Sequence, residues 1–436
     1  MKRAFLWLIM LTLVLVSFDN HEAIEISERA LVHAVGIDQS EEGITVTLQV
    51  FKASGAGSDT QIDPSKPNIF VISNTAESFD EAMDKCESQM GKYLFIGHNQ
   101  IIVLGSQVSF DDPNKLLGYF IKNKDNYLGV SVLMAENTAK EIMEVQLSAG
   151  AVASENFTEI LDMYYRNGET VFSDMLHFIN SMKSLDKSTV LPVVSVKQLS
   201  TQDQNNPSQP NDLEQYNDSS QQQDESSQSN ADSSQSESSS ESGKSDSSSQ
   251  RKSSQASESG ESKGGGSEEG SQAAEQLITI EKSAVIGGGK LKGFINEDEI
   301  KGLNWLTDHM KETVVNTQVD GKQIGVTVKK RSVKNKLVKK DNRLVYKTDI
   351  DVNILTDTNI LTSFNEDNLK ESVSRKIKKD CKAAADKAFY EYGTDCFNCY
   401  RLIKFYYPQI YLDYSENFDV LKQIIDFETT VKCYIK

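Results

Sequence analysis

The chain has 436 residues, of which 38% are hydrophobic, and its 64 acidic against 46 basic residues give a formal net charge of -18. This composition excludes a protein with many membrane-spanning helices, and the acidity argues against a nucleic-acid-binding protein, which would present a basic face. Residues 200–275 alone contain 15 Asp and Glu against 4 Lys and Arg, so most of the net charge belongs to that stretch. The rest of the chain therefore has the charge of ordinary globular domains and is long enough for two sizeable cores.

The first 18 residues have the form of an export signal. Lys2 and Arg3 precede an almost unbroken apolar run at 4–16, which is short for a bilayer-spanning helix of about 20 residues. Residues 15–17 follow the order aliphatic, small, small that precedes the lipidated cysteine of bacterial lipoproteins, but Phe18 stands at the position of that cysteine. We therefore predict an exported chain without a lipidated residue, whose residues 1–18 form a signal peptide or an uncleaved signal-anchor.

Residues 22–197 are predicted to form an amino-terminal domain of mixed strands and helices. Apolar alternation and short β-branched runs predict strands at 30–37, 44–50, 93–96, 101–104, 128–135 and 190–196. Apolar residues at helical spacing predict helices at 79–90, 113–120, 138–145, 157–165 and 171–182. This mixed order predicts an α+β or α/β sheet domain.

Residues 198–275 consist largely of Ser, Gln, Glu, Asp and Gly, with almost no aromatic or β-branched side chains. Such a segment cannot bury enough apolar surface to offset the conformational entropy of ordering it. We therefore expect a disordered, acidic, low-complexity linker between two folded blocks.

The second block is expected to hold a small middle domain at 276–310, which can continue into the following strands, and a carboxy-terminal domain at 311–436. Strand-like runs at 276–286 and 291–295 flank a triple glycine at 287–289. A hairpin turn is predicted there, because the G-x-x-x-x-G-K-[ST] frame of a phosphate loop is absent. Asn296 is expected to cap a short helix that includes Trp305.

The rest of the second block predicts a sheet covered by a long helix. Alternating residues predict an antiparallel meander with strands at 314–319, 323–330, 336–340 and 344–355. Ser363 to Glu366 have the spacing of a capping box for an amphipathic helix that ends at Gly393. A second helix is predicted at 397–407, ended by Pro408, and a last strand at 427–435.

No catalytic arrangement emerges from the sequence, and we predict no catalytic, cofactor-binding or metal-binding residue. Cys396 and Cys399 have C-x-x-C spacing, which suits a redox pair or half of a zinc site, but no second cysteine or histidine pair has matching spacing. A thiol oxidoreductase that uses these two cysteines is the least favoured hypothesis. His98, directly after Gly97, is the best single candidate for a site residue, although one histidine beside a strand is more often a turn or packing residue.

Two segments resemble the signatures of one known family. Residues 91–105, GKYLFIGHNQIIVLG, resemble the "G-x-x-L-F-F-G-H-x-x-x-I-I-x-G" stretch of the Ger(x)C spore germination proteins. Residues 283–306, SAVIGGGKLKGFINEDEIKGLNWL, are similar to the second signature of that family. We expect the matching motif positions to be structural, because the resemblance assigns no ligand site; they are Phe95, Gly97, His98, Gly293, Asn296, Glu297, Gly302 and Trp305.

The resemblance implies a non-enzymatic lipoprotein, the C subunit of a nutrient germinant receptor, built from three α/β or α+β domains. It implies a place at the outer face of the spore inner membrane, with integral-membrane A and B subunits and the membrane surface as partners. Phe18 in place of the lipidated cysteine departs from the family, and so does the long acidic spacer. A soluble extracytoplasmic protein that binds a small molecule in a cleft between the two blocks is the alternative.

Overall fold

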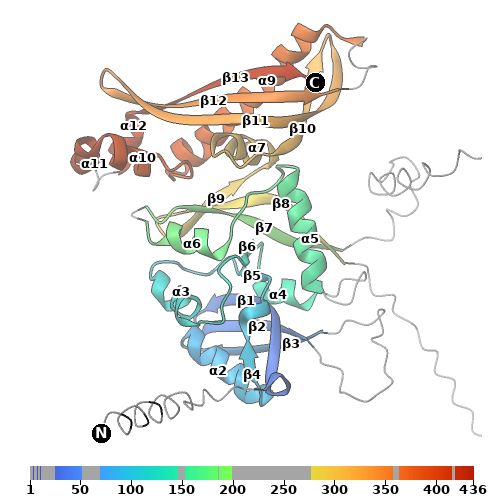
Figure 1. Ribbon diagram of the computed structural model, residues 1–436, viewed down its shortest axis with the longest axis vertical. Coiled ribbons are helices and arrows are strands. Elements are labelled where there is room, and N and C mark those ends of the chain that lie inside the picture. The colour runs from blue at the N-terminus through green and yellow to red at the C-terminus, as the bar shows by residue number, and fades with distance from the viewer. Residues whose placement is uncertain are drawn as a thin grey trace, which may run out of the picture. The chain divides into compact units, whose positions relative to one another are not determined.

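The computed structural model describes residues 25–51, 69–145, 153–184, 186–198, 276–356, 363–414 and 418–436, together with residues 3, 7 and 10. Phe18, most of the predicted signal segment and the acidic linker from residue 199 to 275 lie outside the described residues. The described residues form two β-sheets with helices packed against them (Figure 1). The predicted fold class, sheet-plus-helix domains of the α+β or mixed α/β type, is confirmed.

The first sheet has nine strands, in the order β3-β2-β1-β5-β6-β7-β8-β9, with β4 paired to β1. The four central strands, β1, β5, β6 and β7, are parallel to one another. On either side of them, β1-β2-β3 and β7-β8-β9 pair antiparallel. The strands are β1 (Arg29–Ser40), β2 (Gly43–Phe51), β3 (Ile69–Ala76), β4 (Tyr93–Phe95), β5 (Ile101–Leu104), β6 (Ser131–Ala135), β7 (Thr189–Gln198), β8 (Gln276–Gly287) and β9 (Lys290–Ile295).

Helices cover both faces of the first sheet. Along β5, Ile102 and Leu104 belong to one apolar core, and Ile101 and Val103 belong to another on the opposite face. The strand is therefore buried on both faces, as is usual for parallel strands, and its sequence is continuously apolar. The helices are α2 (Phe79–Met90), α3 (Pro113–Lys122), α4 (Ala139–Glu144), α5 (Ala153–Arg166) and α6 (Met175–Met182), with 3-10 turns at Ile26–Glu28 and Ile96–His98.

Strands β8 and β9 lie in the first sheet, although the sequence places them after the acidic linker. β8 pairs with β7 from Thr189 opposite Ile286 to Gln198 opposite Gln276. The predicted hairpin turn between β8 and β9 is confirmed, and Gly288 and Gly289 have φ angles of 62° and 76°. Such left-handed angles strain residues that carry a Cβ, which explains the glycines in this turn.

The second sheet has four strands, in the order β10-β11-β12-β13. The predicted antiparallel meander is confirmed for β10 (Glu312–Val319), β11 (Lys322–Lys340) and β12 (Arg343–Leu355), and β13 (Ile425–Ile435) pairs parallel to β12. One apolar core joins this sheet to the long helix through Val352, Leu369 and Ile377. The helices are α7 (Glu297–Leu306), α9 (Glu366–Ala384), continued by a π-helical turn (Ala385–Glu391), α10 (Cys399–Tyr406), α11 (Pro408–Tyr414) and α12 (Phe418–Gln423).

Three local predictions were wrong. The helix predicted at 171–182 begins only at Met175, because the carboxylate of Asp174 accepts the backbone N–H of His177 at 2.6 Å and caps the helix there. Asn365, not Ser363, caps α9. The runs at 323–330 and 336–340 form one strand, β11, because a register shift between Lys330 and Ser332 interrupts the alternation without ending the pairing.

Candidate functional site

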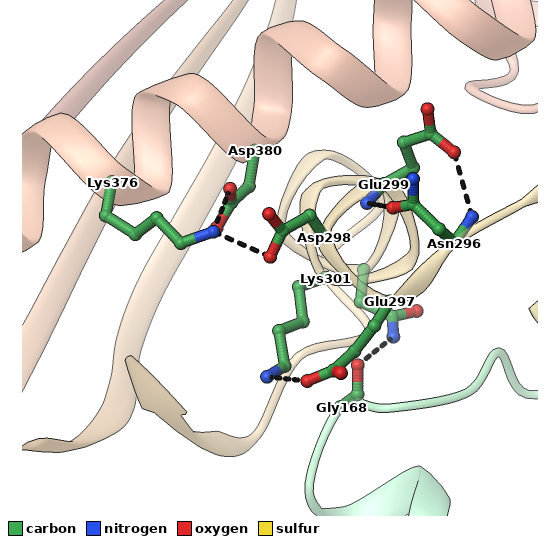
Figure 2. Close-up of polar contacts among 9 residues, drawn as sticks. Gly168, Asn296, Glu297, Asp298, Glu299, Lys301, Lys376 and Asp380 are labelled. Atoms are coloured by element: carbon green, nitrogen blue, oxygen red, sulfur yellow. Dashed lines mark hydrogen bonds and ion pairs between the residues drawn. The ribbon is translucent and has the colours of Figure 1, made fainter. Parts of the chain in front are cut away.

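The second motif forms helix α7, which begins with a capping box. The Asn296 side chain accepts the backbone N–H of Glu299 at 3.1 Å, and the Glu299 carboxylate accepts the backbone N–H of Asn296 at 2.8 Å (Figure 2). Glu297 and Asp298 add two more carboxylates to the first turn, where the helix dipole favours negative charge. The predicted Asn296 cap is confirmed, and its side chain is used to start the helix.

Gly302 allows α7 to pack directly on the backbone of α9. A Cβ built on Gly302 would lie 2.0 Å from the carbonyl oxygen of Asp380 and 2.8 Å from the backbone nitrogen of Cys381. Real Cβ atoms do not approach backbone atoms so closely, and neither backbone can yield without moving a helix. This close approach gives a physical reason for glycine at this motif position.

A partly buried ion-pair cluster lies beside this contact. Lys376 of α9 donates to Asp298 of α7 at 2.6 Å and to Asp380 of its own helix at 2.8 Å (Figure 2). The Asp380 side chain is only 5% exposed. Burial raises the pKa of Asp380 to about 6, despite the nearby Lys376 ammonium. Asp298 of α7 and Asp380 of α9 thus share one ammonium group, which fixes the turn of α7 that faces α9.

The carboxyl end of α7 binds the chain that follows α5. The buried Asn304 amide donates to the carbonyl oxygens of Gly168 and Thr170, at 3.3 and 2.9 Å. Its neighbour Trp305 is fully buried in the core of the second sheet. Helix α7 therefore connects a loop of the first sheet to the core of the second.

Gly293, in β9, permits a second close contact. Its φ angle is 156°, and a Cβ there would lie 2.5 Å from the ring of Tyr392, whose hydroxyl donates to the Phe294 carbonyl at 3.0 Å. Glu297, the remaining motif residue, forms an exposed ion pair with Lys301 at 2.6 Å. Exposed pairs of this kind stabilise a helix by about 0.3 to 0.5 kcal/mol, so Glu297 matters mainly for the start of α7.

The first motif surrounds β4 and the 3-10 turn after it. The Phe95 ring packs edge-on to His98, with centroids 5.6 Å apart, and the Arg29 guanidinium lies 5.0 Å from the centroid of Phe95. A Cβ on Gly97 would lie 2.6 Å from the Phe95 ring and 2.9 Å from the Asp125 carbonyl oxygen. His98 itself is exposed, and no described acid or nucleophile lies beside it as a catalytic site would require.

The structure does not bring the two motifs together. The first motif includes β4 and β5, whereas the second motif begins in β8 and β9, and β6 and β7 lie between β5 and β8. At about 4.8 Å per strand, this separates β5 from β8 by roughly 14 Å. The motif residues therefore form two packing clusters and not one binding site.

A polar groove lies between the two sheet domains, at the carboxyl end of α7. Its volume is about 710 Å³, and residues of α6 face residues of α10 across it. A smaller inner cavity of about 70 Å³ adjoins it and includes Thr189, a buried residue whose hydroxyl has no described hydrogen-bond partner. Charged and titratable side chains of both domains line the larger groove: His177, Lys183, Asp186, His309, Asp395, Arg401 and Lys404.

The loop before α10 is organised by the buried carboxylate of Asp395. It accepts the backbone N–H groups of Phe397, Cys399 and Tyr400 at 3.1, 2.9 and 2.8 Å. Burial raises the pKa of Asp395 to about 6, because its effect is larger than the opposite effect of the three N–H donors. Asp395 thus supplies the cap that Asn398, in a left-handed conformation, does not provide.

The C-x-x-C pair does not have the electrostatics of a catalytic thiol pair. All five cysteines are free thiols in the structure. Burial, and then the nearby Asp395 carboxylate, raise the pKa of both Cys396 and Cys399 well above its usual value, although Cys396 keeps some exposed surface. A redox-active thiol needs a lowered pKa, because the thiolate is the nucleophile. This geometry opposes the oxidoreductase hypothesis.

Among the described residues, no group of three or more His, Cys, Asp or Glu side chains is arranged to hold a metal ion. None of the described helices combines the length and the apolar character needed to span a bilayer.

Sequence reasoning missed the residues that give the motif helix its surroundings. Lys376 and Asn304 were not singled out, because their partners in other elements lie far away in the sequence. Asp380 is four residues from its partner Lys376, but no local pattern shows that its side chain is buried. Asp395 was missed as well. A signal was available only for Asn304, since an amide within an apolar helix segment, between Leu303 and Trp305, needs buried hydrogen-bond partners.

Comparisons with known proteins agree on one family. A model described as the spore germination protein N-terminal domain matches residues 22–196, and one described as spore germination B3/GerAC like, C-terminal, matches residues 281–436. Spore germination protein B3 of Bacillus subtilis (strain 168) is 25% identical over 163 residues, which cover 34% of this chain and 44% of that protein. The aligned part thus spans less than half of that relative.

A solved structure titled "Crystal Structure of the GerBC protein" is similar over 92% of this chain and 96% of that chain, with a TM-score of 0.44 and 15% identity. The two family models match both folded blocks, and the residues of both motifs fall within them. The chain belongs to the Ger(x)C family of spore germination proteins.

Proposed function

We propose that this chain is the non-enzymatic C subunit of a nutrient germinant receptor, required for assembly or signalling of the receptor that triggers spore germination. Its partners are the integral-membrane A and B subunits, and its place is the outer face of the spore inner membrane. The family membership supports the proposal, and the observation that carries it is the use of the motif residues. Gly302, Asn296 and Gly97 serve the packing of the folded body, as expected of a structural subunit.

A deletion strain tests this function. Spores that lack the chain should form in normal number but fail to respond to one class of nutrient in a panel of single amino acids, measured by the fall in optical density of a spore suspension. Re-expression of the wild-type chain should restore the response. Normal germination with every nutrient that triggers the parent strain would contradict the proposal.

We propose that an uncleaved segment of residues 4–18 and the partner subunits hold the protein at the membrane, because Phe18 cannot carry a lipid. The wild-type chain and Phe18→Cys should be compared by membrane fractionation. We expect wild type mainly in the membrane fraction and Phe18→Cys there at least as completely. A wholly soluble wild-type chain would rule out this means of retention.

The groove supports a second candidate function, binding of a small polar molecule without partner subunits. Lysine and arginine side chains at its rim and the Asp186 and Asp395 carboxylates would suit a ligand with charged groups. Calorimetry of the purified chain with the same amino-acid panel tests it, with Arg401→Ala as the matched variant. Saturable heat that Arg401→Ala abolishes would favour this function, and no heat from any compound would exclude it for the panel.

A further inference from the structure

Strand β10 forms one edge of the second sheet, and in the described chain it pairs only with β11. The Lys311 carbonyl accepts the Lys330 N–H at 2.8 Å, so the backbone groups of residue 311 point toward β11. Because backbone direction alternates along a strand, those of residues 312, 314, 316 and 318 point outward. The Gln318 carbonyl fits this pattern, since it accepts the Ser372 hydroxyl of α9 at 3.0 Å.

The outward backbone groups of Glu312, Val314 and Asn316 have no hydrogen-bond partner among the described residues. Natural edge strands are usually protected by lysine, proline or a bulge. β10 has the sequence ETVVNTQV, which contains none of these residues, and its pairing with β11 runs without a register shift. Val314 is 49% exposed. The edge is therefore able to pair with another extended chain.

Helix α9 adds a basic row beside this edge. A cavity of about 730 Å³ lies between β10, β11 and α9, and the described residues that line it include Arg375, Lys376 and Lys379 but no carboxylate. Lys376 is held by Asp298 and Asp380. Among the described residues, Arg375 forms an ion pair only with Glu371, in a contact whose side chains are 70% and 71% exposed, and Lys379 forms none. Arg375 and Lys379 are thus available to an incoming anionic group.

The spacing of these two cations matches that of an extended chain. Residues four apart in a helix lie on one face and differ by about 6 Å along the axis. Residues two apart in a strand lie on one face and differ by about 6.7 Å. A strand added to β10 with acidic side chains at alternate positions could therefore place one carboxylate near Arg375 and the next near Lys379.

We propose that the β10 edge and the basic row of α9 form a docking site for an extended acidic segment of a partner protein. The segment adds as a fifth strand, so its backbone pairs with Glu312, Val314 and Asn316 and its alternate carboxylates pair with Arg375 and Lys379. This inference goes beyond the proposed function and does not rest on it, because it concerns only the edge strand and the helix beside it.

The probe is a fluorescein-labelled peptide of alternating Thr and Glu, titrated with the full chain and followed by fluorescence anisotropy. We expect saturable binding that weakens with added salt. A peptide of the same composition that repeats Glu-Glu-Thr-Thr should bind about tenfold more weakly, because its residues two apart are never both glutamate, so only one of the two cations can be matched at a time. Equal binding of the two peptides would overturn the docking mode in favour of simple charge attraction.

Two sets of variants separate the backbone from the charges. Asn316→Pro removes an outward N–H and no bond to β11, so it should weaken binding about tenfold, whereas Asn316→Ala should stay within about twofold of wild type. Arg375→Glu with Lys379→Glu should weaken binding about tenfold or more. Urea unfolding checks that all variants fold.

Wild-type affinity in Asn316→Pro, or in the charge-reversed variant, would overturn the proposal. Concentration-dependent dimers in sedimentation that Asn316→Pro abolishes would assign the edge to a second copy of the chain instead.

Discussion

The position of Gly302 has no room for a side chain, since the carbonyl of Asp380, 78 residues away, occupies the space that a Cβ would need. Gly118, in α3, is a matched glycine whose Cβ position has no atom within 4 Å. The two residues therefore distinguish a glycine required by packing from one that is merely tolerated in a helix.

Gly302→Ala should lower the free energy of unfolding by about 2 to 4 kcal/mol, because α7 and α9 must separate to admit the methyl group. Gly118→Ala should raise it by about 0.5 to 1 kcal/mol, because alanine favours the helix. Urea unfolding followed by circular dichroism measures both. Equal effects of the two substitutions would show that the α7–α9 contact is loose in solution.

Asp380 gives the stability a pH dependence. Its pKa is about 6 in the folded chain, above the usual value of 3.8, so the folded state holds the proton more tightly than the unfolded state does. Its contribution to stability is therefore complete below about pH 4 and declines as the pH rises to 6. Asp395, also with a pKa raised to about 6, acts in the same direction.

Asp380→Asn should reduce the loss of unfolding free energy between pH 4 and pH 7 by roughly 1 to 2 kcal/mol, because the amide does not titrate. Lys376 keeps Asp298 as its partner in this variant. Urea unfolding at pH 4, 5, 6 and 7 measures the slope. Parallel pH profiles for the variant and wild type would mean that Asp380 titrates normally in the folded chain.

At the scale of the element, helix α7 has two different ends. Its amino end is closed by its own capping box, whereas its carboxyl end depends on the loop after α5, through the bonds from Asn304 to the Gly168 and Thr170 carbonyls. These two bonds, together with the one from the Tyr392 hydroxyl to the Phe294 carbonyl, are polar contacts between the two sheet domains.

Asn304→Ala should lower the free energy of unfolding by about 2 to 3 kcal/mol, because two buried carbonyls lose their donor. It should also increase amide hydrogen exchange in the loop around residues 168–170. Asn180→Ala, at an exposed position of α6, is the control and should change stability by less than about 0.5 kcal/mol. Unchanged exchange in that loop would contradict the connecting role of Asn304.

Local signals in the sequence predicted the elements better than their ends or partners. Asn296 was predicted correctly as a cap because the whole capping box lies within four residues. Ser363 was predicted wrongly because Asn365, two residues later, offers its side chain to the N–H groups of Asp367 and Asn368. Strand β3 was not foreseen at all, since its second half, with Ser73, Asn74 and Thr75, lacks an apolar alternation.

The candidate site could be predicted only in part, for a related reason. Family resemblance marked Gly302 and Gly293, but their physical roles depend on Asp380 and Tyr392, which no local pattern connects to them. The pairing of β7 with β8 likewise spans the acidic linker, so no local pattern shows that β8 and β9 complete the first sheet.

At the scale of the whole molecule, this pairing places the two ends of the linker side by side. Gln198 and Gln276 are opposite each other in the β7–β8 ladder, so the described chain leaves and re-enters the sheet at one hairpin. We propose on this basis that residues 276–295 belong to the same structural domain as residues 22–197.

Replacing residues 199–275 by Asn-Gly should leave the fold intact, because a two-residue turn can join paired antiparallel strands. Shortening this loop should raise the free energy of unfolding by on the order of 2 kcal/mol, since less loop entropy is lost on folding. Circular dichroism and urea unfolding measure the result. A shortened chain that fails to fold would show that the linker is needed for the β7–β8 pairing.

The parallel pairing of β12 with β13 also constrains the order in which the second sheet can form during synthesis. β13 lies opposite β12 from Leu344 and Ile425 to Ile354 and Ile435, and α9 to α12 separate the two strands in the chain. A ribosome therefore makes the meander and the whole helical segment before the strand that completes the sheet. Until then β12 is an open edge, and a chaperone that shields extended segments would act best in that interval.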